Sequence, residues 1–317
     1  MKTIKRLPSP DDARGARQRI AKYVRRTPTI ADDGIVYKLE FLQVSGSFKP
    51  RGAFNALLQL DQAARTRGVV AFSGGNHGMA VAHVAARLNV PATIFMPKTT
   101  PEAVIERARA DGADVVLTET IAQALEQVEE RAAAGQTLIH PYDDERVIEG
   151  QGTIGLELLE DIPDLATLVV SIGGGGLISG IASVIKQLKP QVRIYGVETR
   201  GADAMRKALN AGQPVTLPAI TSIARTLGAP IVSDTTLHAV QTLVDDVVTV
   251  DDADAVAAIL DLQKDLHVTV EPAAACCLAA LRLSLVPRAP DGATAVLLCG
   301  GNVGLDEIIA WREAFAR

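Results

Sequence analysis

The sequence Leu168-Val169-Val170-Ser171-Ile172-Gly173-Gly174-Gly175-Gly176 places four consecutive glycines directly after an apolar, largely β-branched run. Residues 177–185 follow with the apolar spacing of a helix, so the stretch predicts a strand, a tight loop and a helix start. Backbone without Cβ atoms can approach a ligand closely and direct several N–H groups at one anion, and the helix dipole adds to the attraction. We therefore expect a phosphate-binding loop of an α/β protein at Gly173, Gly174, Gly175 and Gly176.

A second chemical feature is Lys49, which lies in Gly46-Ser47-Phe48-Lys49-Pro50-Arg51-Gly52. Pro50 suits the first turn of a helix, where its missing N–H costs nothing, and residues 51–64 have an amphipathic pattern. Lys49 would then lie at the N-terminal end of that helix, where the helix dipole and desolvation both lower the pKa of a lysine. A lysine with a lowered pKa suits Schiff-base chemistry, so Lys49 is the candidate nucleophile.

Short apolar segments alternate with helical patterns along most of the chain. The first series has strands at 68–73, 92–96, 114–117 and 137–139 and helices at 77–88, 101–111 and 121–134. The second series has strands at 168–172, 193–197, 247–250 and 293–298, joined by the early segment 35–39. Such alternation predicts parallel sheets with helices on both faces. We expect two α/β domains: a large one of residues 1–65 plus 145–317, and a small one, residues 66–144, inserted into it.

Two more loops follow predicted strands. Ser73-Gly74-Gly75-Asn76-His77 lies between a strand and a helix, where small residues leave N–H groups free at a helix N-terminus to bind a carboxylate. Cys299-Gly300-Gly301-Asn302 follows the strand at 293–298. Open parallel sheets bind their ligands at the carboxyl ends of the strands. We therefore expect these two loops and the glycine loop to converge on one site.

The glycine loop also leaves a dinucleotide site open. The dinucleotide fingerprint is Gly-x-Gly-x-x-Gly with an acidic residue about 20 positions later, and Glu198 provides such an acid. The third glycine is absent, because Ile178 or Ser179 fills its place. A nicotinamide-dependent oxidoreductase is thus an alternative function, although it gives Lys49 no role.

Composition restricts the class of protein. The chain has 317 residues, 48% hydrophobic and 22% charged, so it can bury a large core. Its net charge is −5 and no lysine or arginine cluster is interleaved with aromatics, so we expect no nucleic-acid partner. No signal peptide or apolar run of transmembrane length is recognisable, so no membrane association is expected. Three cysteines without Cys-x-x-Cys spacing fit a cytoplasmic protein, and five histidines show no zinc-ligand spacing.

Several motifs, taken in order over nearly the whole chain, resemble the threonine/serine dehydratase and serine racemase family of fold-type II pyridoxal-phosphate enzymes. They are Ser47-Phe48-Lys49-Pro50-Arg51-Gly52, Ser73-Gly74-Gly75-Asn76-His77, His140-Pro141-Tyr142-Asp143-Asp144 with Gly150-Gln151-Gly152-Thr153, the four glycines, Val270-Glu271-Pro272 and Cys299-Gly300-Gly301-Asn302. The resemblance implies two open, twisted parallel-sheet α/β domains of the tryptophan synthase β type, with the cofactor between them.

The resemblance also implies roles for single residues. Lys49 would hold pyridoxal 5′-phosphate as a Schiff base and remove the substrate α-proton, and Gly173 to Gly176 would bind the phosphate. Asn76 would contact the 3′-oxygen of the ring and Cys299 the pyridine nitrogen, while Phe48 and Glu271 complete the cofactor-binding set. Ser73 and the N–H groups of Gly74, Gly75, Asn76 and His77 would hold the substrate carboxylate. The implied reaction removes water from a threonine-like or serine-like amino acid and gives a 2-oxo acid and ammonia.

The chain departs from the family pattern at three places. Serine racemases have a second serine, the base of the opposite face, where this chain has Gly74, so racemisation through that base is not expected. Arg225 stands where the family often has Asp and is expected to alter substrate choice. Glu198 matches the family's divalent-cation site and Asp203 is a second candidate ligand, but Ala204 stands where an acid is often found. The need for a divalent cation therefore stays open.

Other activities on the same fold remain alternatives: an amino-acid racemase, a β-replacement enzyme and a catalytically silent pyridoxal-phosphate-binding protein. Threonine, serine, 3-hydroxyaspartate and aryl-serines share the α-amino acid and β-hydroxyl that this chemistry needs, so the sequence does not select among these substrates. A homodimer is expected by family analogy, and no regulatory domain is expected after Arg317.

Overall fold

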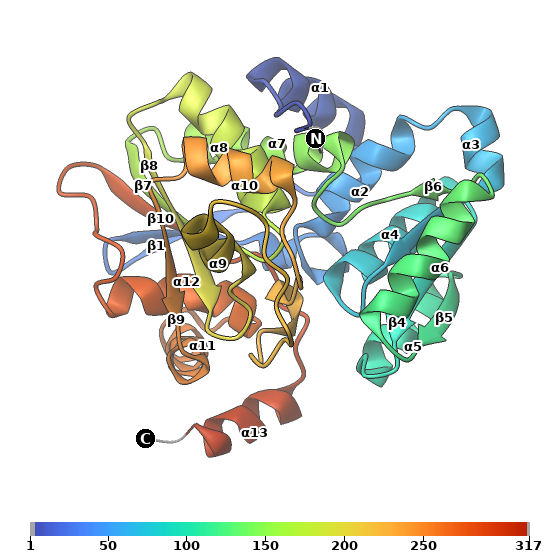
Figure 1. Cartoon of the computed structure of the whole chain (residues 1–317). Helices are drawn as coiled ribbons and strands as arrows, with labels where there is room; N and C mark the ends of the chain where they lie inside the picture. The colour runs from blue at the N-terminus through green and yellow to red at the C-terminus, as the bar shows by residue number, and fades with distance from the viewer. Residues whose placement is uncertain (1–3, 316–317) are drawn as a thin grey trace.

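The strands form two separate sheets, as a computed structural model shows for residues 4–315 (Figure 1). The larger sheet has six strands in the order β1-β2-β10-β7-β8-β9. They are β1 (Thr29–Asp32), β2 (Ile35–Lys38), β10 (Ala293–Leu297), β7 (Leu165–Ser171), β8 (Arg193–Thr199) and β9 (Asp246–Val250). Neighbours are parallel except β1 and β2, which form an antiparallel hairpin at one edge. The predicted α/β fold class is confirmed, with β1 as an unpredicted edge strand.

The smaller sheet has four parallel strands in the order β5-β4-β3-β6. They are β3 (Val69–Phe72), β4 (Ala92–Pro97), β5 (Asp114–Thr118) and β6 (Thr137–Leu138). Its helices α4 (Asn76–Leu88), α5 (Glu102–Ala110) and α6 (Ile121–Ala133) lie on the right of Figure 1. In β3, Val69 and Ala71 pack in the cluster of α4, whereas Val70 packs in the cluster of α6. Both faces are thus covered, as the apolar runs predict.

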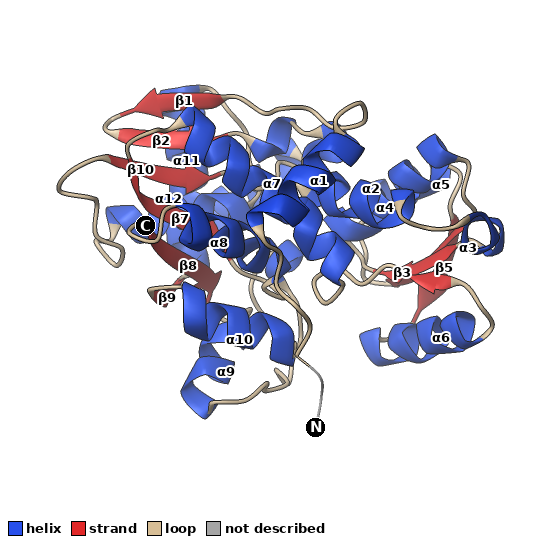
Figure 2. Ribbon diagram, turned by 90° about the horizontal axis from the view of Figure 1, so that it is seen from above, coloured by secondary structure: helices blue, strands red, loops and turns tan. Residues whose placement is uncertain are grey.

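Helices also cover the larger sheet, as the view in Figure 2 shows. One group contains α7 (Glu145–Asp161), α8 (Gly176–Leu188), α9 (Ala204–Ala211) and α10 (Asp234–Leu243). The remainder are α11 (Asp252–Leu266), α12 (Pro272–Arg282) and α13 (Leu305–Ala314), and α12 packs on β7, β8, β9 and β10. The buried apolar residues of these elements join those of the strands in one core. Burial of this surface is the main stabilising contribution.

Three helices precede the smaller sheet. They are α1 (Pro10–Ile20), α2 (Lys49–Leu58) and α3 (Gln62–Arg67), with short 3₁₀ turns at Glu40–Leu42 and Val44–Gly46 and a later one at Arg225–Leu227. The single helix predicted over residues 51–64 is wrong, because the chain breaks at Leu60 and Asp61 restarts it by accepting the N–H of Ala64. Asp61 is an N-cap, which the amphipathic pattern does not reveal.

Helix α2 lies between the two sheets. It packs against α7 of the larger unit and α4 of the smaller one, and its Phe54 and Leu57 belong to the core of the smaller unit. The predicted domain boundaries at residues 66 and 144 stay a proposal, but the position of α2 explains how its first residue, Lys49, reaches the space between the units. In residues 4–315, no helix has the length and apolar character needed to cross a membrane.

Candidate active site

All of the predicted cofactor-binding residues line one cavity of about 50 Å³. Its lining comes from the start of α2, the start of α4, the glycine loop after β7 and the segments at 271–273 and 299. The residues are Phe48, Lys49, Asn76, Tyr142, Ser171, Gly173, Gly174, Gly175, Gly176, Leu177, Thr226, Leu227, Glu271, Ala273 and Cys299. Loops at the carboxyl ends of β3, β7 and β10 therefore meet here, as the sequence predicts.

Lys49 is the first residue of α2, and its side chain enters the cavity. Its Nζ donates a hydrogen bond to the carbonyl of Pro141 at 3.0 Å and lies 5.0 Å from the centre of the Phe48 ring. Burial lowers the pKa of Lys49 to about 8, and electrostatic interactions with Cys299 and Glu271 oppose that shift only in part. About a tenth of this amine is therefore neutral at pH 7 and about half at pH 8, and the neutral form is the one that a nucleophilic lysine requires.

The four glycines form the turn between β7 and α8. Gly175 has a φ of 92° in the left-handed region and is the N-cap residue of α8. A Cβ on Gly174 would lie 2.1 Å from the ring of Tyr142, and one on Gly176 would lie 2.7 Å from the Tyr142 backbone. Side chains are thus excluded by close approach as well as by φ, and backbone N–H groups at a helix N-terminus line the cavity, an arrangement that suits a phosphate.

Asn76 is held in place by two side chains, Glu271 and Asn302. Its amide Nδ2 donates to both carboxylate oxygens of Glu271, at 2.9 and 3.1 Å, and its Oδ1 accepts from Asn302 at 2.7 Å. Thr226 donates to the same carboxylate at 3.0 Å. Burial raises the pKa of Glu271 to about 7, although the bonds from Asn76 and Thr226 oppose this. Asn76 therefore presents a fixed amide to any ligand in the cavity.

Cys299 follows β10 and is buried beside Ser171, the last residue of β7. The Ser171 hydroxyl donates to its Sγ at 3.4 Å. Burial raises the pKa of Cys299 well above its usual range, and the charge of Glu271 acts in the same direction. The thiol is therefore neutral at pH 7 and offers no charge to a ring nitrogen.

The predicted carboxylate loop connects β3 to α4. Ser73 accepts the N–H of Gly75 at 3.2 Å, so it forms a local turn rather than capping α4. His77 bonds through Nε2 to the carbonyl of Ile139 at 2.8 Å, and burial lowers its pKa to about 3. Within residues 4–315, the N–H groups of Asn76 and His77 have no protein acceptor. Ser73, Gly74, Gly75 and His77 do not line the cavity, but this end of α4 opens beside it.

Sequence reasoning gave no role to three residues that the structure brings to the cavity or its edge. Tyr142 covers Gly174 and donates its hydroxyl to the Ile231 carbonyl at 2.7 Å. Thr226 and Asn302 hold Glu271 and Asn76. Tyr142 and Asn302 belong to two of the family motifs, which could have marked them as site residues. Their contacts could not be predicted, because their partners lie far away in the sequence.

The proposed cation ligands are engaged elsewhere. Glu198 accepts the N–H groups of Met205 and Arg206 at 2.9 and 2.7 Å, at the start of α9, and burial raises its pKa to about 8. Asp203 pairs with Lys207. In the part of the chain that the structure describes, no group of three or more His, Cys, Asp or Glu side chains could hold a metal ion. The structure gives the divalent-cation hypothesis no support.

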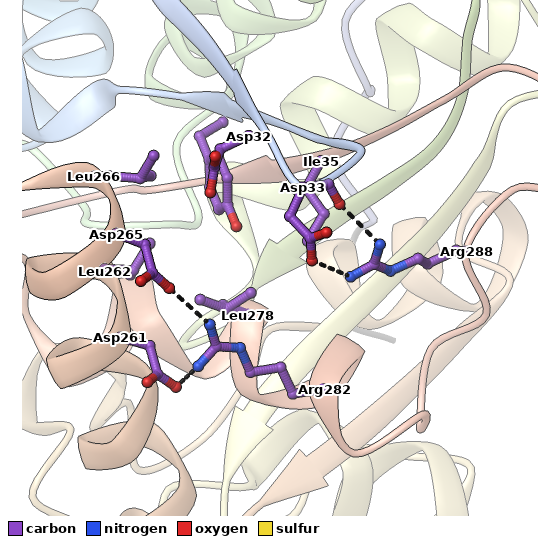
Figure 3. Close-up of a pocket in the computed structure, with 11 residues that line it drawn as sticks. Asp32, Asp33, Ile35, Asp261, Leu262, Asp265, Leu266, Leu278, Arg282 and Arg288 are labelled. Carbon is purple, nitrogen blue, oxygen red and sulfur yellow. Dashed lines mark hydrogen bonds and ion pairs between the residues drawn. The ribbon is translucent and has the colours of Figure 1, made fainter.

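A larger cavity, of about 360 Å³, lies away from Lys49, where the turn between β1 and β2 meets α11 and α12 (Figure 3). Arg282 pairs there with Asp261 and Asp265, and Arg288 donates to the Asp33 carbonyl at 2.9 Å. None of the predicted site residues lines this cavity. This cavity has the greater volume, but the predicted catalytic and cofactor-binding residues line the smaller cavity around Lys49.

A family model described as pyridoxal-phosphate dependent enzyme matches residues 20–301. The chain belongs to this family. Serine racemase of Arabidopsis thaliana is 38% identical over 307 residues, with 92% of each chain covered. An L-threonine ammonia-lyase of Geobacter sulfurreducens is 40% identical over 308 residues, covering 92% of this chain and 75% of the relative. The structure of maize serine racemase has a TM-score of 0.90 at 35% identity, and 98% of both chains is covered.

These comparisons confirm the resemblance to threonine/serine dehydratases and serine racemases and the fold-type II architecture. Membership favours pyridoxal phosphate over the nicotinamide cofactor that the glycine spacing left open. Racemases and ammonia-lyases match at similar identity, so membership leaves the choice between dehydratase and racemase to the residues of the site.

Proposed function

We propose that this protein is a pyridoxal-phosphate-dependent ammonia-lyase that removes water from a β-hydroxy-α-amino acid and releases a 2-oxo acid and ammonia. The observation that carries the choice is Gly74. A Cβ at this position would lie 2.5 Å from Oγ1 of Thr100, closer than real Cβ contacts, so a serine does not fit without a shift of its neighbours. A second base of the racemase kind is thus missing, whereas elimination needs only Lys49.

The residues of the cavity fit the cofactor. Gly173 to Gly176 would hold the phosphate through backbone N–H groups, Asn76 would donate to the ring oxygen, and Phe48 lies beside Lys49. Cys299 would meet the pyridine nitrogen as a neutral thiol, which leaves that nitrogen largely unprotonated. When bound, pyridoxal phosphate supplies the electron sink that stabilises negative charge at the α-carbon.

The protein's own groups would bind the substrate and move its proton. The free N–H groups of Asn76 and His77, together with Ser73, would hold the substrate carboxylate at the positive end of α4. The neutral amine of Lys49 would take the proton from the α-carbon, and the resulting ammonium would return a proton to the β-hydroxyl, which would leave as water. Glu271 would keep Asn76 oriented throughout.

Loading the cofactor requires movement of Tyr142. The cavity is small, at about 50 Å³, and the Tyr142 ring lies over Gly174. Among the residues that the structure describes, the Tyr142 hydroxyl makes one hydrogen bond, to the carbonyl of Ile231. We expect the ring to swing away from the glycine loop when phosphate binds there.

The first test compares the absorption spectra of the wild type and Lys49→Ala, followed by assays of 2-oxo acid and ammonia with L-threonine and L-serine. A band near about 410 nm that is lost or altered in the variant, together with keto-acid release, would support the lyase. A band without keto acid would move the search to 3-hydroxyaspartate and aryl-serines. Absence of the band after cofactor addition would refute the cofactor site at Lys49.

The alternatives give different products. A racemase would convert L-serine to D-serine faster than it forms pyruvate, as chiral chromatography measures. A β-replacement enzyme would form little keto acid when a nucleophile is supplied, and a silent binding protein would show the band without turnover. A homodimer and a cytoplasmic location also belong to the proposal by family analogy, and light scattering tests the first.

A further inference from the structure

The hydroxyl of Thr100 is buried without a partner. Thr100 is 8% exposed, and its Oγ1 has no hydrogen-bond partner within the described residues. Burying an unpaired hydroxyl destabilises a protein, and most such groups in native structures have a ligand, an ion or a water as partner. The position of Thr100 therefore needs an explanation beyond packing.

The backbone fixes where this hydroxyl lies. Thr100 ends the turn after β4, in which its N–H donates to the carbonyl of Pro97 at 2.9 Å. The N–H of Lys98 donates to Thr118 O at 2.8 Å, which ties the same turn to β5. The Thr100 side chain is thus presented from a rigid segment of the smaller sheet.

Thr100 points at the proposed carboxylate loop. Its Oγ1 lies 2.5 Å from the place that a Cβ on Gly74 would take, while the next nearest atom there, of Pro97, is 3.5 Å away. Gly74 has no positive φ, so its backbone conformation would admit other residues. Close approach of the hydroxyl is therefore what requires glycine at this position.

The loop from Ser73 to His77 beside Thr100 offers hydrogen-bond donors and contains no carboxylate side chain. Ser73 already accepts the N–H of Gly75, and the N–H groups of Asn76 and His77 are free at the start of α4. A threonine hydroxyl can add one more donor to such a set. The nearby Lys98 pairs with Glu119 at the surface, so neither of those charges is available to the hydroxyl.

We propose that Thr100 is a substrate-binding residue whose hydroxyl, held against Gly74, donates to the α-carboxylate of the amino acid. The proposal rests on the proposed function, because it places the carboxylate at the loop of Ser73 to His77. Thr100 binds substrate and takes no part in the proton transfer at Lys49. Removal of the Thr100 hydroxyl is therefore expected to weaken substrate binding and to leave the rate of the chemical step unchanged.

The test uses Thr100→Val, which keeps the shape and removes the hydroxyl. Thr99→Val is the matched control, because Thr99 is exposed. For the holoenzyme, Kd for L-alanine is measured by spectral titration, since L-alanine has the carboxylate but no β-hydroxyl to lose. For L-serine, kcat and KM are measured. Thermal unfolding of the cofactor-free protein reports any structural role.

We expect Thr100→Val to raise Kd for L-alanine and KM for L-serine about tenfold or more, as for a lost hydrogen bond to a charged group, with kcat within about threefold. Its cofactor-free Tm should equal or exceed that of the wild type, because an unpaired hydroxyl is removed. Unchanged Kd, or a Tm that falls with Kd, would overturn the proposal. Thr99→Val should leave all four quantities unchanged.

A second variant guards against misfolding. Gly74→Ala should displace the hydroxyl and weaken L-alanine binding, but should add little in the Thr100→Val background, because both changes remove the same contact. Fully additive losses would contradict the assignment. A wild type that binds L-alanine without converting any hydroxy amino acid would refute the proposed lyase while leaving this test intact.

Discussion

Lys49 and Arg51 are cations two residues apart in α2, yet their surroundings are opposite. Lys49 projects into the cavity, where its one hydrogen bond within the described residues is to the carbonyl of Pro141, and its pKa is lowered to about 8. Arg51 is 1% exposed and pairs with both Glu40 and Glu157, each at 2.7 Å, which raises its pKa despite burial. Residues two apart face different sides of a helix, so one turn of chain serves two environments.

The partners of Arg51 belong to a wider ionic cluster under α2. Lys38 of β2 pairs with Glu157 and Asp161 of α7 at 2.8 and 3.0 Å, and it donates to Thr27 O at 2.7 Å. Every buried charge in this cluster has a counter-charge, whereas Lys49 has none within ion-pair distance among residues 4–315. The cluster anchors α2 to the larger unit, and Lys49 is left electrically unpaired. Arg51 thus contributes to the structure, and Lys49, two residues before it, is the candidate for the chemistry.

The strongest test of this division is Lys49→Ala. We expect turnover to fall by at least about a thousandfold, equivalent to roughly 4 kcal/mol, and the cofactor absorbance to be lost. Stability of the cofactor-free protein should be unchanged or higher, because an unpaired buried amine is removed. Steady-state assays and urea unfolding measure the two effects. Comparable losses of stability and activity would show that Lys49 is structural.

Arg51→Met tests the other half. Removing the guanidinium leaves Glu40 and Glu157 buried without their partner, so we expect a loss of about 3–5 kcal/mol in the free energy of unfolding. Arg26→Met is the control, since Arg26 also pairs with two carboxylates, Glu160 and Asp161, but its side chain is 50% exposed. That control should lose less than about 1 kcal/mol. Equal losses of unfolding free energy in both variants would mean that the buried ion pairs contribute no more to stability than the exposed ones.

The elements of the site were predictable because their signals are local. Strand-loop-helix boundaries at Gly173 to Gly176 and the helix start at Lys49 follow from apolar periodicity, glycine and proline. The helix break at Leu60 and Asp61 was missed, since the amphipathic pattern continues across the cap. The edge strand β1 was missed because none of its residues is fully buried.

Contacts between distant segments could not be read from the sequence. Tyr142 over Gly174 and Asn302 on Asn76 depend on how the two sheets are placed relative to one another, and Thr100 against Gly74 depends on the pairing of β3 with β4. The lowered pKa of Lys49 was predicted in direction, from a helix N-terminus and desolvation. Its main cause in the structure is burial in the cavity.

The pH dependence of stability sharpens the contrast further. Lys49 has a pKa of about 8 in the folded protein, against an ordinary value of 10.5. Between these values the unfolded chain binds more protons at this residue, so the free energy of unfolding rises with pH. Below pH 8 the full penalty of a buried cation is present. We therefore expect cofactor-free Lys49→Met to exceed the wild type in stability most at pH 7 and by progressively less up to pH 10.

Urea unfolding at intervals of one pH unit checks this. The exposed Lys98, whose side-chain exposure is 58%, provides the control variant Lys98→Met, which should show no comparable trend. A constant difference between Lys49→Met and the wild type from pH 7 to 10 would mean that the folded pKa of Lys49 is not lowered.

The smallest expected effect comes from Glu271→Gln, which removes a carboxylate that acts on Lys49, whereas Arg51 keeps both of its carboxylate partners. The carboxylate of Glu271 raises the pKa of Lys49 in part, so its removal should lower that pKa and move the acidic limb of the activity profile to lower pH. The glutamine can still accept from Asn76, so turnover at pH 8 should change by less than about tenfold. Glu307→Gln is the control, because Glu307 pairs with Arg225 outside the cavity. An unshifted limb would mean that Glu271 is neutral beside Lys49 and does not raise the pKa of this lysine.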